Sequence, residues 1–214
     1  GVELFVLDDG WFGQRNDDHA GLGDWVANPE RLPNGIKGLS ERIEAMGIKF
    51  GLWFEPEMTN KDSDLYRAHP DWILHTPGRN ASHGRYQYVL DFSRKEVVEY
   101  IYEMMAKILS EAKVSYIKWD MNRSITECYS VALPADRQGE VFHRYILGVY
   151  DLYERLTSEF PEVLFESCSS GGGRFDPGML YYAPQGWTSD DSDAIERLKI
   201  QYGTSLCYPI SSMG

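Results

Sequence analysis

The chain has 214 residues, of which 43% are hydrophobic and 14% aromatic, so it is long enough to bury one large core. Its formal net charge of −12 at pH 7 leaves no basic surface to neutralise phosphates, which argues against nucleic acids and anionic membranes as partners. No apolar run approaches the roughly 20 residues that a membrane span needs, and no signal-peptide pattern opens the chain.

Cysteine is rare in the chain. Cys128, Cys168 and Cys207 are widely spaced and odd in number, which favours free thiols over a disulfide framework or a zinc knuckle. Free thiols are typical of a reducing compartment, so we expect a cytoplasmic protein. The chain opens without Met in a strand-like run and ends just after another, and we interpret it as a fragment. Any localisation signal would then lie outside these residues.

Strand-like and helix-like segments alternate along the chain. Apolar runs predict strands at residues 2–7, 48–54, 88–90, 114–119, 163–165, 180–187 and 206–210. Helical spacing and capping residues predict helices at 39–46, 61–69, 94–112, 138–160 and 194–202. We expect Ser93 to cap the third helix, and Asp193 with Glu196 to form a capping box on the last. Residues 13–38 are too long for a simple connector and predict a functional loop.

This βα alternation predicts an α/β fold with a parallel sheet and right-handed crossovers. An open doubly wound sheet and a closed barrel both fit that rhythm. About seven repeats without a domain break, and polar residues after nearly every strand, favour a (β/α)8 TIM barrel. Such a barrel normally takes about 250 residues, so we expect most of one, with a unit missing.

Polar side chains stand at the C-terminal ends of the predicted strands, where a barrel would bring them to one mouth. They are Asp8, Asp9, Glu55, Asp91, Lys118, Asp120, Glu166, Cys168, Asp190 and Asp191. In the strand 114–119, alternation puts Lys118 and Asp120 on one face. A charged pair at the end of a buried strand is either a structural salt bridge or part of a site. We treat Glu55, Asp91 and Glu166 as structural or supporting carboxylates.

Convergent carboxylates act either as ligands for a hard metal ion or as acids and bases on a neutral substrate. Aromatic rings favour the second interpretation, since Trp11, Trp25, Trp53, Trp119 and Trp187 lie in or beside the strand ends and can pack on sugar C–H faces. None of the five histidines follows a strand, so we expect no metal and no cofactor. The motifs GxSxG, HExxH, GxxxxGK[ST] and GxGxxG are absent.

Six ordered motifs carry a resemblance to a known family. They are FVLDDGWFG (5–13), GLGDW (21–25), GLWFEPEM (51–58), YIKWDMNR (116–123), ESCSSGGGRFDPG (166–178) and WTSDDSDAIERLKIQYG (187–203). Together they resemble the catalytic barrel of glycoside hydrolase family 36, the microbial α-galactosidases. The resemblance implies a retaining enzyme in which Asp120 is the nucleophile and Asp190 the acid/base. By the same resemblance, we expect residues 1–214 to be a single partial (β/α)8 barrel domain that lacks the first strand and the last unit, with the family's flanking β-sandwich domains absent.

The resemblance also implies how galactose is held. Its 4- and 6-hydroxyls would be bound by Asp8, Asp9, Trp53, Arg85 and Lys118, while Asn122, Cys168 and Gly171 complete the sugar site. Charged groups around an axial hydroxyl select galactose over glucose, because the epimer leaves them unpaired. The expected partners are α-galactoside oligosaccharides such as melibiose and raffinose, and full-length relatives are expected to be homo-oligomers.

The implied reaction has two steps through a covalent galactosyl-aspartate. A retaining pair of carboxyl groups should lie about 5 to 5.5 Å apart, and Lys118 would help to keep Asp120 ionised. Three alternatives stay open at this point: galactosyl transfer to a sugar acceptor, a metal-dependent barrel lyase or hydrolase, and a fragment that is not catalytic.

Overall fold

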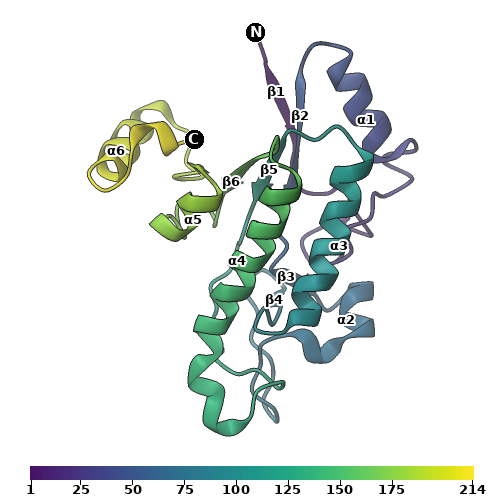
Figure 1. Ribbon diagram of the computed structural model, residues 1–214, viewed down its shortest axis with the longest axis vertical. Helices are drawn as coiled ribbons and strands as arrows, with labels where there is room; N and C mark the ends of the chain where they lie inside the picture. Colours follow the sequence, from purple (N-terminus) through teal and green to yellow (C-terminus); the bar gives the residue numbers. More distant parts are fainter.

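The computed structural model describes all residues from 1 to 214, as an α/β fold built on one parallel sheet (Figure 1). The sheet has five strands in the order β1-β2-β5-β6-β7. Their bounds are β1 (Leu4–Leu7), β2 (Lys49–Phe54), β5 (Tyr116–Trp119), β6 (Leu164–Ser167) and β7 (Gln185–Gly186). The predicted α/β class and parallel sheet are confirmed. The sheet is open, with β1 and β7 at its edges, so closure into a barrel stays a prediction.

The helices are α1 (Gly35–Glu44), α2 (Asp64–Ala68), α3 (Lys95–Glu111), α4 (Val141–Glu159), α5 (Pro177–Tyr182) and α6 (Ala194–Ser205), with 3-10 turns η1 (Pro70–Trp72), η2 (Ala135–Glu140) and η3 (Ile210–Ser212). The two longest, α3 and α4, lie side by side, and each buries an apolar face in the core. Helix α6 stands apart from the sheet and buries no residue (Figure 1). No helix is both long enough and apolar enough to cross a membrane.

The strand register fixes which side chains meet at the C-terminal edge of the sheet. Trp53 of β2 lies level with Lys118 of β5, and Lys118 lies level with Glu166 of β6. Asp120 directly follows β5, and its N–H continues the ladder by donating to the carbonyl of Phe54 at 2.8 Å. The strands therefore deliver these polar side chains to a common edge, as period-2 alternation predicts.

The third predicted strand is not part of this sheet. β4 (Gln87–Val89) pairs antiparallel with β3 (Met58–Asn60) in a separate two-stranded sheet, and β2 pairs directly with β5. The chain passes from β2 to β3 through a short turn without a crossover helix, so residues 55–90 form an excursion rather than a βα unit. Including this segment among the parallel repeats was wrong.

Two later strand predictions also fail. Asp176 accepts hydrogen bonds from the N–H groups of Gly178 and Met179, and Pro177 occupies the first turn, so the start of the segment 180–187 belongs to helix α5 and only β7 is extended. Residues 206–210 are not a strand, because α6 runs on to Ser205 and a 3-10 turn follows. Only a parallel bridge between Gly186 and Met213 reaches the sheet there.

The predicted helices are present, with different boundaries and caps. Arg94, rather than Ser93, is the N-cap of α3, since the Ser93 hydroxyl donates to Asp91. Asp193 caps α6 as predicted, accepting from the N–H groups of Ile195 and Glu196. The side chain of Glu196 instead pairs with Lys199, so the capping box is only half formed.

Candidate active site

The carboxylate of Asp120 lies almost buried at the end of β5, with 6% of the residue exposed. Its Oδ2 accepts hydrogen bonds from Trp53 Nε1 at 3.2 Å and Asn122 Nδ2 at 2.8 Å. Its Oδ1 accepts from the N–H of Met121 at 2.8 Å and, more weakly, from the N–H of Ser170 at 3.4 Å. Four donors around one carboxylate fix its orientation.

Lys118 is paired with Asp8 rather than with Asp120. Its Nζ lies 2.9 Å from Asp8 Oδ2, across from β5 to the end of β1. Burial acts to lower the pKa of Lys118, but the hydrogen bond from Lys118 to Asp8 and the charge of Asp8 outweigh it, and the pKa lies above its ordinary value. A structural salt bridge between Lys118 and Asp120, the bland interpretation of that strand end, is therefore wrong.

Asp9 turns away from Asp8 to a different cation. Arg15 donates to both carboxylate oxygens of Asp9, at 3.0 Å from Nε and 2.8 Å from Nη2. The arginine side chain is only 3% exposed and also bonds Asn60 Oδ1 at 3.3 Å. The two vicinal aspartates thus have separate partners, and Asp9 is held by the long loop that follows β1.

Asp190 is exposed, and Trp187 Nε1 donates to its Oδ1 at 3.1 Å. Gly171 packs against its backbone: a Cβ there would lie 2.7 Å from Ser189 Cα and 2.9 Å from Asp190 N, and Gly171 has φ +81°. The preceding residue, Ser170, contacts Asp120. The turn after β6 therefore touches both predicted catalytic aspartates, and Gly171 permits its close approach to Asp190.

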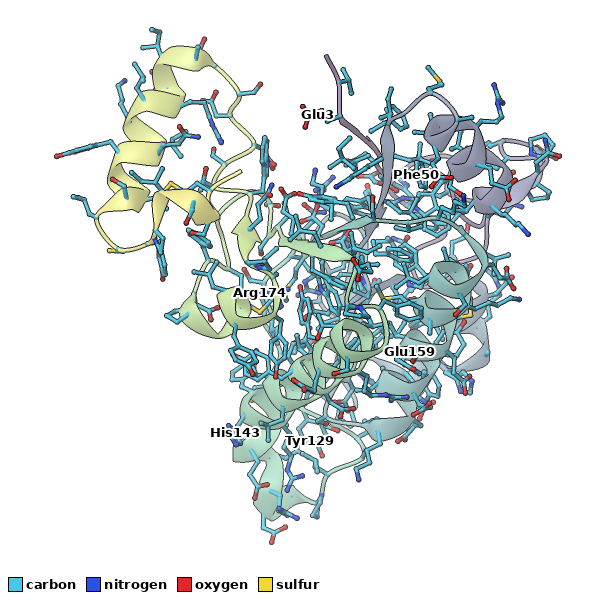
Figure 2. The ribbon with its side chains drawn as sticks, turned by 45° about the horizontal axis from the view of Figure 1, so that its top comes forward. Glu3, Phe50, Tyr129, His143, Glu159 and Arg174 are labelled. Carbon is cyan, nitrogen blue, oxygen red and sulfur yellow. The ribbon has the colours of Figure 1, made fainter.

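A buried ion pair anchors that turn. Arg174 donates to both oxygens of Glu57, at 2.9 and 2.7 Å, and Trp119 Nε1 and the Tyr145 hydroxyl also donate to this carboxylate. Burial is the largest single influence and raises the pKa of Glu57, but the charge of Arg174 and the hydrogen bonds to the carboxylate together outweigh it and hold the pKa below its ordinary value. Figure 2 marks Arg174 where the C-terminal segment meets the body of the molecule. Glu57 and Arg174 join the β6 turn to the end of β2.

Asn122 and Cys168 both border Asp120. Asn122 binds Asp120 directly, and its Oδ1 accepts from the Ser170 hydroxyl at 3.0 Å. Cys168 is 2% exposed, and burial, followed by the charge of Asp120, raises the pKa of its thiol well above the ordinary value. It is therefore neutral at pH 7 and unsuited to act as a nucleophile. All three cysteines are free, as predicted.

Arg85 is the one predicted site residue that the structure leaves apart. It is exposed, has φ +52°, and makes no side-chain hydrogen bond or ion pair within the chain. Its turn is held from the neighbouring sheet, since Asn60 Nδ2 donates to the carbonyl of Tyr86 at 3.0 Å. Asn60 also accepts from Arg15, so the Arg85 turn and the loop that carries Arg15 share one anchor.

The carboxylates predicted to be structural divide into two kinds. Asp91 holds the Ser93 and Ser130 hydroxyls and serves a loop. Glu55 and Glu166 lie close enough to Asp120 for its charge to act on both: burial is the largest cause of the raised pKa in each, and the charge of Asp120 adds to it. No group of three or more His, Cys, Asp or Glu side chains is arranged to hold a metal ion.

Sequence reasoning missed Arg15, Asn60 and Arg174. Arg15 is the only Lys or Arg among the first 30 residues, in a segment rich in aspartate. That isolation could have identified it as the ion-pair partner of a nearby aspartate. Asn60 and Arg174 have no such signal, because their partners come from distant parts of the chain.

The comparison with known families decides the chain's affiliation. All residues from 1 to 214 match the family model Melibiase. The chain belongs to the Melibiase family. This confirms the resemblance to glycoside hydrolase family 36, the family named for the matching crystal structure of AgaA.

Curated relatives match this Melibiase chain over its whole length. It is 60% identical over 214 residues to α-galactosidase AgaA of Geobacillus stearothermophilus and 57% identical over 213 residues to α-galactosidase Mel36A of Lactobacillus acidophilus. Each match covers 100% of this chain and 29% of the relative. The chain therefore spans less than a third of the curated relatives' length.

Solved structures agree with the fold. The crystal structure of AgaA superposes with a TM-score of 0.98 at 60% identity, covering 100% of this chain and 30% of the other. A more distant match, α-galactosidase TtGalA of Thermus thermophilus, has a TM-score of 0.63 at 34% identity, covering 88% and 35%. The arrangement of β1, β2, β5, β6 and β7 is thus shared with a domain of these enzymes.

Proposed function

We propose that this chain is the catalytic part of a retaining α-galactosidase, with Asp120 as nucleophile and Asp190 as acid/base. The observation that carries the proposal is the setting of Asp120, a buried carboxylate at a strand end, oriented by four donors and joined through the turn at Ser170 and Gly171 to the backbone of Asp190. The α-galactosidase names of the relatives support the substrate class.

Two substituted forms of AgaA, each in complex with an oligosaccharide, add support for the pair. One complex, with raffinose, carries an aspartate-to-asparagine substitution, and the other, with stachyose, an aspartate-to-alanine substitution. The two substituted positions are 70 residues apart, the same separation as Asp120 and Asp190. Both oligosaccharides are α-galactosides, which we propose as the substrate class here.

In the first step Asp120 attacks the anomeric carbon, and the bond to the leaving oxygen breaks as protonated Asp190 gives that oxygen its proton. The product is a β-galactosyl ester of Asp120. In the second step Asp190 takes a proton from water, the water oxygen bonds to the anomeric carbon as the bond from that carbon to the Asp120 oxygen breaks, and galactose leaves with retained configuration while Asp120 regains its carboxylate. Trp53 and Asn122 stay bonded to Oδ2 and hold the carboxylate in line for attack.

Sugar recognition is assigned to the groups around this centre. The ion pair of Asp8 with Lys118 offers one acceptor and one donor, suited to adjacent hydroxyls, and the Asp9 carboxylate is fixed by Arg15. Cys168 lies beside Asp120 as a small neutral contact. Arg85, free of partners within the chain, is assigned to the substrate through its turn on the β3-β4 sheet.

We further propose that the five parallel strands form part of a (β/α)8 barrel and that residues 1–214 act as one partial barrel domain. The common edge that carries Asp8, Trp53, Lys118 and Asp120 corresponds to the mouth where such barrels place their chemistry. The protein as a whole is proposed to act on α-galactoside oligosaccharides, including melibiose, raffinose and stachyose.

The test uses the protein with its full natural sequence, an aryl α-galactoside and added azide. Asp120→Ala should lose hydrolysis by at least about 10⁴-fold, and azide should restore turnover with β-galactosyl azide as product. Asp190→Ala should keep activity on substrates with good leaving groups, and azide should there give the α-galactosyl azide. Undiminished hydrolysis by Asp120→Ala would refute Asp120 as the nucleophile. If the two variants gave each other's azide product, Asp190 would be the nucleophile and Asp120 the acid/base.

A further inference from the structure

Glu55 is a fully buried carboxylate next to the proposed nucleophile, and the mechanism above gives it no task. It follows directly after β2. The N–H of Asn122 donates to its Oε1 at 2.5 Å, and Gln87 Nε2 donates to its Oε2 at 2.9 Å. Buried carboxylates are usually paired with a cation. Here both donors are neutral amides, and the cation that acts on Glu55, Arg15, forms its ion pair with Asp9.

Asn122 connects Glu55 to Asp120. Its backbone N–H is held by Glu55, its Nδ2 donates to Asp120 Oδ2 at 2.8 Å, and its Oδ1 accepts from the Ser170 hydroxyl at 3.0 Å. The main chain and the side chain of Asn122 are both fixed by these bonds. Any change at Glu55 is therefore passed to the amide that orients the nucleophile.

The two carboxylates are also coupled through their charges. Burial, and then the charge of Asp120, raise the pKa of Glu55 to about 7. The groups that face Glu55 are Asp120 at the end of β5, Arg15 in the loop after β1, and the neutral amides of Gln87 and Asn122. Coupling is reciprocal, so an ionised Glu55 disfavours the charge on Asp120 by the same free energy.

The surroundings suit both protonation states of Glu55. Gln87 Oε1 is buried and has no hydrogen-bond partner. In the present orientation the Gln87 amide donates to an ionised Glu55, and a flip of that amide would present Oε1 to a protonated Glu55 with no change in the number of hydrogen bonds. A change of protonation at Glu55 therefore needs no rearrangement beyond one amide rotation.

We propose that Glu55 is a positioning residue for Asp120. Glu55 holds Asn122 against the nucleophile, and the charge on Glu55 sets how readily the Asp120 carboxylate is converted into the uncharged galactosyl ester. The inference rests on the proposed function of Asp120. An ionised Glu55 favours the neutral ester, and a protonated Glu55 makes Asp120 the better leaving group during hydrolysis. Formation of the ester removes the charge on Asp120, so Glu55 releases its proton to solvent and takes one back when hydrolysis restores the carboxylate.

The test measures kcat/KM against pH with a dinitrophenyl α-galactoside, whose leaving group needs no proton, so that ionisation of Asp190 does not shape the profile. The wild-type value should rise through a midpoint near pH 7 by roughly tenfold, the effect of a shift of about one unit in the pKa of a neighbouring carboxyl. Glu55→Gln keeps the size of the side chain and the oxygen that accepts from the Asn122 N–H. Its kcat/KM should not change with pH and should equal the low value that the wild type shows in acid. A wild-type profile in Glu55→Gln would overturn the proposal.

Asp91→Asn is the matched control, because Asp91 is an equally buried carboxylate that bonds Ser93 and Ser130 and not Asp120. It should lower stability and keep the rise in kcat/KM near pH 7. Loss of that rise in Asp91→Asn as well would show a general response to removing a buried carboxylate and would overturn the role of Glu55.

A second measurement does not depend on the folding of Glu55→Gln. Infrared difference spectra follow the C=O stretch of the buried protonated carboxyl during titration, and Glu166→Gln distinguishes the band of Glu55 from that of Glu166. In Asp120→Asn the midpoint of the Glu55 band should fall by about one unit, because the neighbouring charge is gone. An unmoved midpoint would overturn the coupling.

The two levels of the argument fail separately. Retention of hydrolysis by Asp120→Ala would remove the proposed function and this inference with it. Inactive Asp120→Ala that azide rescues, together with a wild-type profile in Glu55→Gln, would leave the proposed function standing and remove only the role of Glu55.

Discussion

Gly171 offers a direct test of the way the β6 turn positions Asp190. Gly171→Ala places a methyl group where the nearest backbone atoms, Ser189 Cα and Asp190 N, lie at 2.7 and 2.9 Å, closer than real Cβ atoms approach. One of the two segments must move by several tenths of an ångström. The residue also keeps φ +81°, which costs roughly 1 to 2 kcal/mol for a residue with a Cβ.

The displacement should appear in activity more than in stability. A misplacement of about 1 Å at a catalytic group costs on the order of 100-fold in rate, so we expect kcat on raffinose to fall by roughly 10- to 100-fold. Raffinose needs a proton for its leaving oxygen, whereas a dinitrophenyl galactoside does not. The loss should therefore be several-fold smaller for the dinitrophenyl substrate, because the displaced group is the proposed acid, Asp190.

Gly47→Ala is the matched control. Gly47 has φ +76°, close to that of Gly171, but nothing lies within 4 Å of its would-be Cβ, and it precedes β2, at the opposite end of that strand from the site. It should lower the free energy of unfolding by about 1 kcal/mol and leave kcat unchanged. Wild-type kcat on raffinose in Gly171→Ala, or equal losses on both substrates, would refute the reasoning.

Two further predictions concern the groups that sequence reasoning missed. Glu57→Gln should lower the free energy of unfolding by about 3 to 5 kcal/mol, because it leaves Arg174 buried without its counter-charge. Since the folded-state pKa of Glu57 lies below its ordinary 4.5, its stabilisation is present above that pH and is lost as the pH falls through the folded value. The melting temperature of the wild type should therefore fall as the pH is lowered through that acid range, and the fall should be smaller in Glu57→Gln. An equal fall in both proteins would contradict this. Arg15→Met should raise KM for aryl galactosides by about tenfold with a smaller change in kcat, because it frees the Asp9 carboxylate without touching Asp120, and a fall in kcat alone would count against that role.

The sequence alone determined the elements and the chemistry at their ends. Short apolar runs at residues 2–7, 48–54, 114–119 and 163–165 located β1, β2, β5 and β6, and alternation correctly placed polar side chains at one edge of the sheet. The six ordered motifs, including the one around Asp120, together carried enough information to name the family, which the comparisons confirm. These features depend on residues close together in the chain, and such local patterns are what a sequence displays directly.

Tertiary structure alone decided how many strands share the sheet and which partner each charge takes. An apolar run cannot tell a strand of a parallel sheet from one of a hairpin, so β4 was assigned to the wrong sheet. Alternation put Lys118 beside Asp120, but Asp8, which follows β1 on the far side of β2, lies 2.9 Å from Lys118 and forms the ion pair instead. The link from Glu55 to Asp120 likewise became visible only through Asn122, which lies 67 positions after Glu55 in the chain. Ion pairs and buried hydrogen bonds join residues distant in sequence, and their geometry exists only once the strands have packed.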